Sequence, residues 1–435
     1  MSRAMKDSGI PWIGEIPSHW RAERIKTIFS ERTELSEDGT EDLLSVSEYY
    51  GVDKRAERVE EGDFVSRSES LVGYKKCYKG DFVSNIMLAW KGSLGVSDYD
   101  GVVSPAYCVY KPSESVYPKY YHYLFRTSLY TGRFRCFSKG IIDSRLRLYS
   151  PYFFDIEAII PPKKEQQDIA DFLDKKCGEI DEMVSLQEKI VEELKAYKQS
   201  VITEVVCRGL NPDVSMKDSG IEWIGQIPEG WEILKTLWAL DMPITDGPHT
   251  TPELFDTGIP FVSAEAVSCG NGGIDFSHIR GFISQEFYEE CCLKYVPQRG
   301  DVYMIKSGAT TGRVSIVDTD KVFTIWSPLA VFRANPKRIL PRFLFYSLQG
   351  EYYQEQVRLG WTYGTQQNIG MRTLETLQIV LPTLSEQQAI VDYLDKQCKG
   401  IDTLISLKQS KIDALKEYKK SIIYEYITGK KEVNG

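Results

Sequence analysis

Apolar residues recur at alternating steps of three and four in two long segments, a spacing that places them on one face of a helix. In the first segment they are Ile169, Leu173, Ile180, Met183, Ile190, Leu194, Tyr197 and Val201. In the second they are Ile390, Leu394, Ile401, Leu404, Leu415, Tyr418 and Ile422, with Ile412 expected to substitute for Lys411. Stripes of this length predict two helices, at 161–207 and 381–428, which pair antiparallel through a coiled-coil-like seam. Ser385 and Gln388 are predicted to form a capping box at the start of the second helix.

The segments around these helices show a shorter alternation. Residues 301–305, 314–317 and 107–110 lie between glycine-rich turns and alternate in the manner of strands. Residues 120–130 and 341–349 are predicted to be helical. The expected fold class is therefore mixed α/β, with strand-containing bodies beside long helices.

A duplication organises the whole chain. Met5–Trp20 returns as Met216–Trp231 with twelve of sixteen positions identical, and Glu165–Glu204 returns as Glu386–Glu425 with twenty of forty. The bodies between these repeats are less alike. The predicted architecture is two similar recognition domains joined by the antiparallel helices with pseudo-two-fold symmetry. Its segments are a lead-in and first domain at 1–160, a first helix at 161–207, a linker, lead-in and second domain at 208–380, a second helix at 381–428 and a tail at 429–435.

Charge is distributed unevenly along the chain. The net charge is −9, yet residues 111–150 contain eight basic residues against two acidic ones, and 321–342 contain five basic residues and no acidic one. Basic stretches rich in aromatic residues suit local binding of phosphates, although a solvated surface has the same composition.

No recognisable catalytic or metal site accompanies this pattern. The nine cysteines are scattered without a C-x-x-C pair and are expected to be buried free thiols. Ser307–Arg313 lacks the glycine spacing and lysine of a P-loop, and Asn211-Pro212 and Asn335-Pro336 lack the rest of an amino-methyltransferase loop. Arg299-Gly300-Asp301 is predicted to be a turn that enters a strand. No apolar run is long enough for a membrane span and no signal peptide is evident, so a soluble cytoplasmic protein without catalytic residues is expected.

The repeated motifs resemble those of the specificity subunits of type I restriction–modification enzymes. The lead-in Met-Lys-Asp-Ser-Gly-Ile-x-Trp-Ile-Gly is similar to the segment that opens their target-recognition domains, and Pro-x-x-x-Glu-Gln-Gln at 161–167 and 382–388 resembles the start of their spacer helices. In the second body, 245–252, 258–263, 306–313 and 364–369 are similar to recurring stretches of these domains. In the first body, Lys91-Gly-Ser-Leu-Gly95 is only a weak match.

This resemblance implies that each body reads one half of a bipartite target in double-stranded DNA, while the helices set the gap. It implies two methyltransferase subunits and restriction/translocase subunits as partners, which would bind S-adenosylmethionine, ATP and Mg²⁺, so that this chain binds no cofactor itself. The DNA-binding residues expected in the second body are Lys306, Ser307, Thr310, Thr311, Arg313, Gln366, Gln367, Asn368, Asp246 and His249. Those expected in the first body are Lys91, Lys139, Ser144, Arg145 and Arg147. Two alternatives stay open: a coiled-coil interaction scaffold that does not read DNA, and a self-contained DNA-modifying enzyme.

Overall fold

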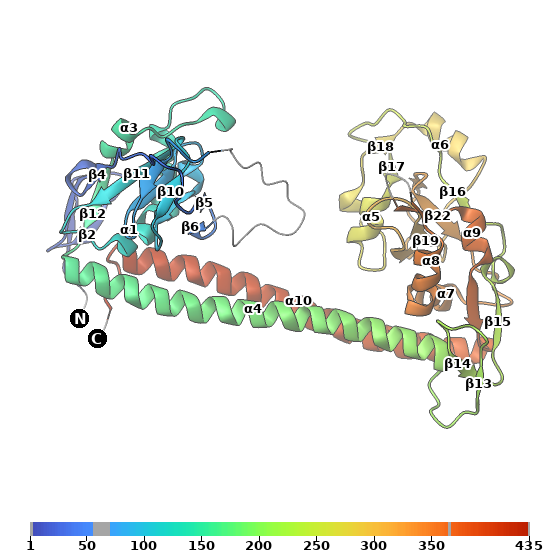
Figure 1. The fold of residues 1–435 in the computed structure, drawn as a ribbon. Coiled ribbons are helices and arrows are strands. Elements are labelled where there is room, and N and C mark those ends of the chain that lie inside the picture. The colour runs from blue at the N-terminus through green and yellow to red at the C-terminus, as the bar shows by residue number, and fades with distance from the viewer. Residues whose placement is uncertain (1–2, 55–69, 364–366, 434–435) are drawn as a thin grey trace. The chain divides into compact units, whose positions relative to one another are not determined.

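Two units make up the structure, a computed structural model that describes residues 3–54, 70–363 and 367–433. Unit 1 combines Met1–Gln187 with Ser410–Gly435, and unit 2 is the continuous segment Glu188–Gln409. Because both boundaries fall inside the long helices, each unit contains one strand-containing body and part of each helix. The first and last described residues therefore belong to the same unit (Figure 1).

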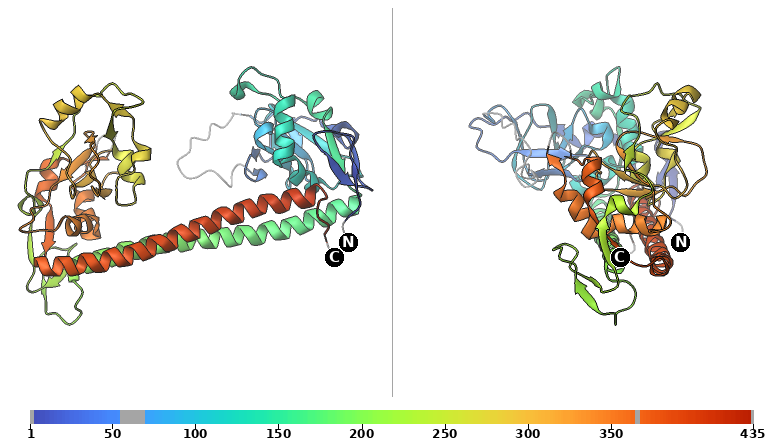
Figure 2. Two further views of the ribbon diagram at one scale, coloured as in Figure 1. Left: turned by 180° about the vertical axis from the view of Figure 1, so that it is seen from behind. Right: turned by 90° about the vertical axis from the view of Figure 1, so that its right-hand side faces the viewer.

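The long helices are α4 (Lys163–Arg208) and α10 (Leu384–Ile427), drawn in green and red in Figure 1. In unit 1 the ring centroids of Phe172 and Tyr426 are 4.4 Å apart, and Lys419 Nζ lies 2.6 Å from Asp181 Oδ2. Since the partner number falls as the α4 number rises, the helices run antiparallel there, as predicted (Figure 2). Lys198 and Asp402, the repeat equivalents of Lys419 and Asp181, form the matching ion pair in unit 2 at 2.7 Å.

The seam between the helices differs from the predicted one at four positions. Met183, Tyr197, Leu404 and Tyr418 are exposed, by 44%, 57%, 47% and 57%. Residues outside the predicted stripe are buried instead, among them Cys177, Val184, Gln187, Val191 and Cys398, and Ile412 is buried as predicted. The apolar pattern was misleading because small or polar residues, Cys177 and Gln187 among them, are buried while larger apolar residues are exposed. The remaining predicted seam residues are buried or half-buried.

The capping box of α10 lies two residues before the predicted position. Thr383 Oγ1 accepts a hydrogen bond from Glu386 N at 3.4 Å, and Glu386 Oε2 accepts one from Thr383 N at 3.1 Å. This reciprocal pair satisfies otherwise free amides at the helix start. Ser385 already lies inside the helix, so the predicted box of Ser385 and Gln388 is wrong.

The repeated Glu–Gln pair at the start of each long helix ties that helix to its body. In unit 2, Trp231 Nε1 donates to Glu386 Oε1 at 3.1 Å, and buried Gln387 accepts from Leu340 N at 2.8 Å. Leu340 is the N-cap of a body helix, so the glutamine fixes where that helix begins. The equivalent bonds in unit 1 are made by Trp20 with Glu165 and by Tyr117 with Gln166. Much of the repeated Glu-Gln-Gln motif is therefore explained by its role in fixing each long helix to its body.

The body of unit 1 is built on an antiparallel sheet in the order β4-β11-β8-β9. The strands of unit 1 are β1 (Met5–Asp7), β2 (Glu15–Pro17), β3 (Arg21–Arg24), β4 (Phe29–Glu31), β5 (Leu44–Ser47), β6 (Gly51–Lys54), β7 (Lys75–Cys77), β8 (Phe82–Asn85), β9 (Leu94–Val96), β10 (Gly101–Val103), β11 (Tyr107–Pro112) and β12 (Glu157–Ile160). A cluster of fully buried aromatic rings that includes Phe82, Phe125, Phe134 and Phe153 packs against this sheet.

The body of unit 2 repeats this sheet with strands in the order β16-β22-β19-β20. It adds a second sheet, β18-β17-β21, in which β17 and β21 are parallel. The strands of unit 2 are β13 (Met216–Asp218), β14 (Gln226–Pro228), β15 (Glu232–Lys235), β16 (Thr245–Asp246), β17 (Ile259–Val262), β18 (Phe282–Ile283), β19 (Val302–Ile305), β20 (Val314–Ile316), β21 (Thr324–Ile325), β22 (Leu329–Phe332), β23 (Thr362–Tyr363), β24 (Gln367–Asn368) and β25 (Gln378–Leu381). The order of the four shared strands makes the two bodies equivalent despite their different sequences.

Short helices complete each body. Those of unit 1 are α1 (Pro118–Phe125), α2 (Ser128–Phe137) and α3 (Ser150–Phe154). Those of unit 2 are α5 (Ala264–Cys269), α6 (Gln285–Cys292), α7 (Pro341–Gln349), α8 (Glu351–Leu359) and α9 (Met371–Thr376). The single helix predicted over 120–130 is wrong, because Thr127 leaves helical geometry and caps α2 by accepting from Tyr130 N. The mixed α/β fold class and the helix at 341–349 agree with the prediction.

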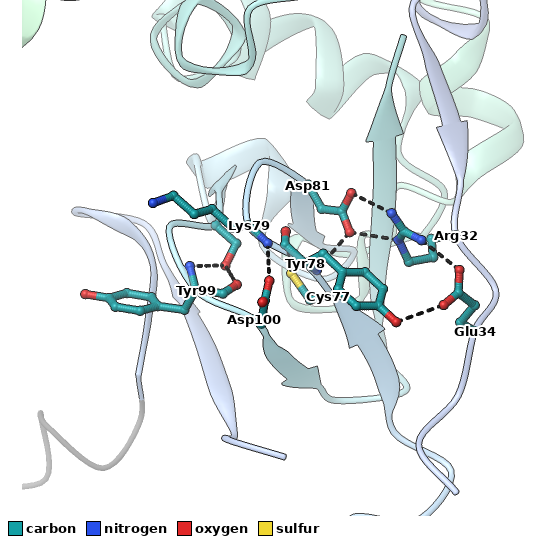
Figure 3. Close-up of polar contacts among 9 residues, drawn as sticks. Arg32, Glu34, Cys77, Tyr78, Lys79, Asp81, Tyr99 and Asp100 are labelled. Carbon is teal, nitrogen blue, oxygen red and sulfur yellow. Dashed lines mark hydrogen bonds and ion pairs between the residues drawn. The ribbon is translucent and has the colours of Figure 1, made fainter. Parts of the chain in front are cut away.

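A buried aspartate anchors the first turn of the central hairpin in both bodies. Asp81 precedes β8 and accepts two hydrogen bonds from Arg32, at 2.8 and 3.1 Å (Figure 3). Asp301 precedes β19 and accepts two from Arg333, both at 2.8 Å. The predicted turn at Arg299–Asp301 is thereby confirmed, with a structural role for its carboxylate.

The cysteines depart in part from the expectation that all are buried. All nine are free thiols, and six are buried, but Cys136 and Cys269 are exposed and Cys292 is half-buried. Along the described chain, no helix combines the length and apolar character needed to cross a membrane.

Candidate nucleic-acid interface

Two loops meet at one end of the central hairpin in each body, and the sequence-predicted residues gather there. In unit 1 they are 86–93, between β8 and β9, and 138–149, between α2 and α3; we call them the first loop pair. In unit 2 they are 306–313, between β19 and β20, and the described residues 360–363 and 367–370, between α8 and α9; we call them the second loop pair.

One backbone hydrogen bond shows that the two loop pairs are equivalent. Leu148 N donates to Ile86 O at 2.8 Å in unit 1, and Ile369 N donates to Lys306 O at 2.9 Å in unit 2. Ile86 and Lys306 directly follow β8 and β19, the same strand of the shared sheet. The two bodies therefore present different side chains from the same place in the fold.

In the second loop pair, main-chain contacts hold the loops together and leave polar side chains exposed. Ser307 forms a β-bridge with Asn368, and Gly308 N donates to Gln367 O at 3.0 Å. Thr311 Oγ1 turns inward and donates to Gly308 O at 2.7 Å. The side chains of Gln367 and Asn368 are exposed, so their amides are available to an external partner.

Arg313 and Thr310 also belong to this pair, in the part of the loop 306–313 that leads into β20. The guanidinium of Arg313 is exposed and makes one hydrogen bond, from NH1 to Ser268 O at 3.1 Å. Thr310 is half-buried. Gln366, also predicted to bind DNA, lies outside the described residues.

Asp246 does not contact the exterior. Its carboxylate is 1% exposed, with Lys306 Nζ 3.3 Å and His249 Nε2 3.2 Å away, and Lys294 Nζ contacts its other oxygen at 2.5 Å. A buried carboxylate needs such cations to offset its desolvation. Lys306 is itself largely buried, at 13% exposed, so Asp246 and Lys306 brace the loop, while His249, 71% exposed, is the accessible member.

The first loop pair is held by arginine. Arg126 donates to Gly92 O at 2.9 Å, Leu94 O at 3.0 Å and Glu48 O at 2.7 Å, and its burial lowers its pKa from the ordinary value. Lys139 and Arg147 exchange two backbone hydrogen bonds of 2.9 Å, which close the base of the longer loop. These bonds fix the shape of the loops from within the body.

The side chains that the first loop pair exposes are mainly cationic. Lys91, Lys139, Ser144 and Arg145 are exposed and Arg147 is half-buried. Lys91 and Arg135 both lie over the ring of Trp90, with centroid distances of 5.2 Å. The one acidic residue of these loops, Asp143, is paired with Arg135 NH2 at 2.9 Å. The local charge is therefore positive, whereas the second pair offers amides, hydroxyls and one exposed guanidinium.

Sequence reasoning missed several members of this site. Arg126, Arg135 and Trp90 in unit 1, and Lys294 in unit 2, have no motif of their own. Arg126 and Arg135 were counted only as bases of 111–150, and Trp90 and Lys294 fell outside the basic stretches, because their role depends on contacts between segments distant in sequence. No cluster of three or more His, Cys, Asp or Glu side chains in the described part of the chain is arranged to hold a metal ion.

Known proteins resemble this chain in sequence and in fold. A family model described as the type I restriction modification DNA specificity domain matches residues 248–417. The type I restriction enzyme MjaVIII specificity subunit of Methanocaldococcus jannaschii is 27% identical over 286 residues, which cover 64% of this chain and 63% of that relative. The EcoBI specificity subunit of Escherichia coli is 24% identical over 251 residues, 56% of this chain and 52% of that relative. Residues 248–417 thus match the model of this DNA specificity domain, and the chain is similar to type I specificity subunits.

Solved structures share the fold across both units. A chain from work on complex assembly and conformational transition of the type I R-M system aligns with a TM-score of 0.69 and 19% identity, covering 95% of this chain and 98% of that one. The HsdS subunit from Thermoanaerobacter tengcongensis aligns with a TM-score of 0.50 and 18% identity, over the same shares of each chain. The relatives are named as specificity subunits, which agrees with the prediction of a subunit that works with partner enzymes. The match to the MjaVIII subunit spans just under two thirds of that protein's length.

Proposed function

We propose that this chain reads a bipartite target in double-stranded DNA, with one half-site for each body. The observation that supports this best is the equivalence of the two loop pairs, which occupy the same place in each body and carry different side chains. A scaffold that only bound proteins would have no need to vary one surface while keeping the sheet and helix anchors. Two readers of different sequences would vary there.

The exposed side chains of the two loop pairs suit different contacts with DNA, base edges for one and phosphates for the other. Exposed amides such as Gln367 and Asn368 can pair with the edge of adenine in the major groove, and Arg313 can pair with guanine. Lys91, Lys139 and Arg145 are suited to phosphates, which position the protein without reading sequence. We therefore assign base discrimination mainly to the second loop pair and a larger electrostatic share to the first.

Selection from randomised duplexes tests this assignment on the complex reconstituted with its methyltransferase subunits. Gln367→Ala should relax one half-site by about 1–3 kcal/mol at the affected position and leave the other half unchanged. Arg145→Ala should weaken binding evenly and reduce its salt dependence. Lys337→Ala and Lys26→Ala are controls, since both side chains are exposed outside the loop pairs. If every variant left both half-sites unchanged, or if the complex bound no DNA, the reading function would be wrong and the scaffold alternative favoured.

Apolar residues that were predicted to lie in the seam, or lie close to it, are exposed on the long helices of each unit. Unit 1 exposes Met183 and Leu186 on α4 and Tyr418 on α10; unit 2 exposes their repeat equivalents Leu404, Leu407 and Tyr197. We propose that each trio docks one methyltransferase subunit, because the surface occurs once per unit and the family supplies this partner. S-adenosylmethionine would then be bound by those subunits, and ATP and Mg²⁺ by restriction/translocase subunits, in a cytoplasmic complex.

Subunit stoichiometry tests the docking surface. Met183→Glu with Leu186→Glu should remove one methyltransferase subunit per complex, and adding Leu404→Glu with Leu407→Glu should remove the second. Lys175→Glu on the exposed face of α4 is the control. Native mass spectrometry that still found two methyltransferase subunits on the quadruple variant would refute the assignment.

We also propose that the helices set the gap between half-sites. Matched insertions of one heptad in α4 and α10 keep the seam in phase and lengthen each helix by about 10 Å. At about 3.4 Å per base pair, the gap should grow by about three base pairs. Mapping the methylated bases in a host that carries this variant measures the gap, and retained methylation with the original gap would show that the spacing is set elsewhere.

A further inference from the structure

The tip of the longer loop in unit 1 exposes two isoleucines among cations. Ile141 is 100% exposed and Ile142 is 53% exposed, although the loop belongs to a body with a large apolar core. Lys139, Arg145 and Arg147 flank them along the loop. Single exposed apolar residues are common on protein surfaces, so a function for this pair has to be argued from the residues and contacts around it.

The loop is built to hold its tip in place. The backbone bridge between Lys139 and Arg147 closes it, and Arg145 N donates to Ile142 O at 2.8 Å inside it. Gly140 has a φ of +155°, and a side chain there would meet Arg145 O at 2.5 Å, so the glycine permits the tight turn before Ile141. A bidentate ion pair between Arg135 and Asp143 fixes the other side. Isoleucine adds its own stiffness, since a β-branched side chain has few rotamers.

We infer that Ile141 is an apolar wedge that enters the DNA at the first half-site, with Ile142 beside it. Proteins that deform a duplex insert Ile, Leu or Phe between base steps while cations hold the phosphates on either side. The loop has both parts: an apolar tip and a positive rim, since Arg135 neutralises its single acid. Its place in the first loop pair, equivalent to the polar loops of unit 2, points to DNA as the occupant. This inference rests on the proposed reading function and adds unstacking of a base step to it.

Fluorescence of 2-aminopurine placed in turn at each position of the selected first half-site tests the wedge in the reconstituted complex. Wild-type protein should raise the fluorescence at one step, because unstacking relieves quenching there. Ile141→Ala should abolish that rise and weaken binding roughly tenfold or more, as expected for loss of a buried isoleucine contact. Val322→Ala is the matched control, since Val322 is 59% exposed on unit 2 and lies between β20 and β21, outside both loop pairs.

Each outcome separates the wedge from the reading function. Unchanged affinity and fluorescence with Ile141→Ala, in a complex that still selects both half-sites, would overturn the wedge and leave the reading function intact. Loss of a methyltransferase subunit in Ile141→Ala would assign the tip to a protein contact and also overturn it. Ile141→Met, which keeps an apolar side chain, should retain most of the fluorescence rise. Absence of sequence-selective binding by the wild-type complex would instead refute the proposed function.

Discussion

Removal of Arg333 should destabilise unit 2 selectively. Asp301 is 2% exposed and accepts two hydrogen bonds from this arginine, so Arg333→Met leaves a buried carboxylate without its cation. The loss of one partner from a buried ion pair costs about 3–5 kcal/mol. At about 1.4 kcal/mol per tenfold, the open population of unit 2 should rise by roughly a hundred- to several thousandfold.

Two other hydrogen-bond donors to Asp301 reduce the cost of removing Arg333, and they determine how far a second substitution can restore stability. Gln298 N still donates to Asp301 at 2.8 Å, and Tyr295 OH contacts the same oxygen. Arg333→Met with Asp301→Leu removes the unpaired charge but leaves Gln298 N without an acceptor, while Tyr295 keeps its 2.9 Å contact with Tyr303. The double variant should therefore recover part of the stability and retain a deficit of about 1–3 kcal/mol.

Hydrogen–deuterium exchange by peptide measures these effects in each unit separately. Arg333→Met should reduce protection in peptides of unit 2 and leave unit 1 unchanged, and Arg32→Met should do the reverse because Arg32 binds Asp81 in unit 1. Arg299→Met is the matched control: its partner Asp320 is 80% exposed, and such a surface pair contributes little. Equal loss of protection in both units, or none in unit 2, would refute the reasoning.

Three further outcomes are expected. Burial and the nearby Arg126 lower the pKa of His122 to about 3. The free energy of unfolding of unit 1 should therefore fall as the pH drops below about 6.5, because the unfolded histidine takes up a proton that the folded one does not. His122→Asn should flatten this pH dependence when hydrogen exchange is measured from pH 7 to 5. Thr383→Ala should cost about 0.5–2 kcal/mol in thermal unfolding and Ser385→Ala much less, and the opposite order would contradict the observed capping box. Maleimide labelling read by mass spectrometry should modify Cys136 and Cys269 first and Cys77 and Cys207 last, since burial raises the pKa of each of the latter two thiols to about 12; early modification of Cys77 would show that its core opens readily.

The sequence predicted those parts of the fold that depend on local periodicity or on repetition. The long helices, their antiparallel pairing and the helix at 341–349 followed from spacing and proline positions. The seam was only partly predicted, because Cys177 and Gln187 occupy buried positions that an apolar pattern does not select, while Met183 and Tyr197 are apolar and exposed. The apolar stripe is wider than the buried seam, so part of it is buried and part is exposed. The sequence alone does not say which part faces the partner helix.

The candidate interface shows a similar division. Gln367, Asn368 and Arg313 were found because their motifs resemble recurring family stretches. The first loop pair had no such motif, and its equivalence to the second depends on a bond between Ile86 and Leu148, which are far apart in sequence. Asp246 lies in 245–252, a stretch that resembles the family's, but its side chain is buried. Its role in that stretch is therefore to hold Lys306 and the neighbouring residues of the loop in place.

The anchored aspartates show one way in which the two bodies can differ in sequence while they keep the same sheet. Asp81 takes its arginine from the segment after β4, and Asp301 takes its arginine from the segment after β22, a different strand of the equivalent sheet. The physical requirement is a guanidinium beside a buried carboxylate, and either strand can supply it. An alignment of the two bodies detects the Gly-Asp turn but cannot align the arginines. The same freedom applies at the loop pairs, where the backbone bond between hairpin and loop is kept and the exposed side chains differ, as the proposed reading of two different half-sites requires.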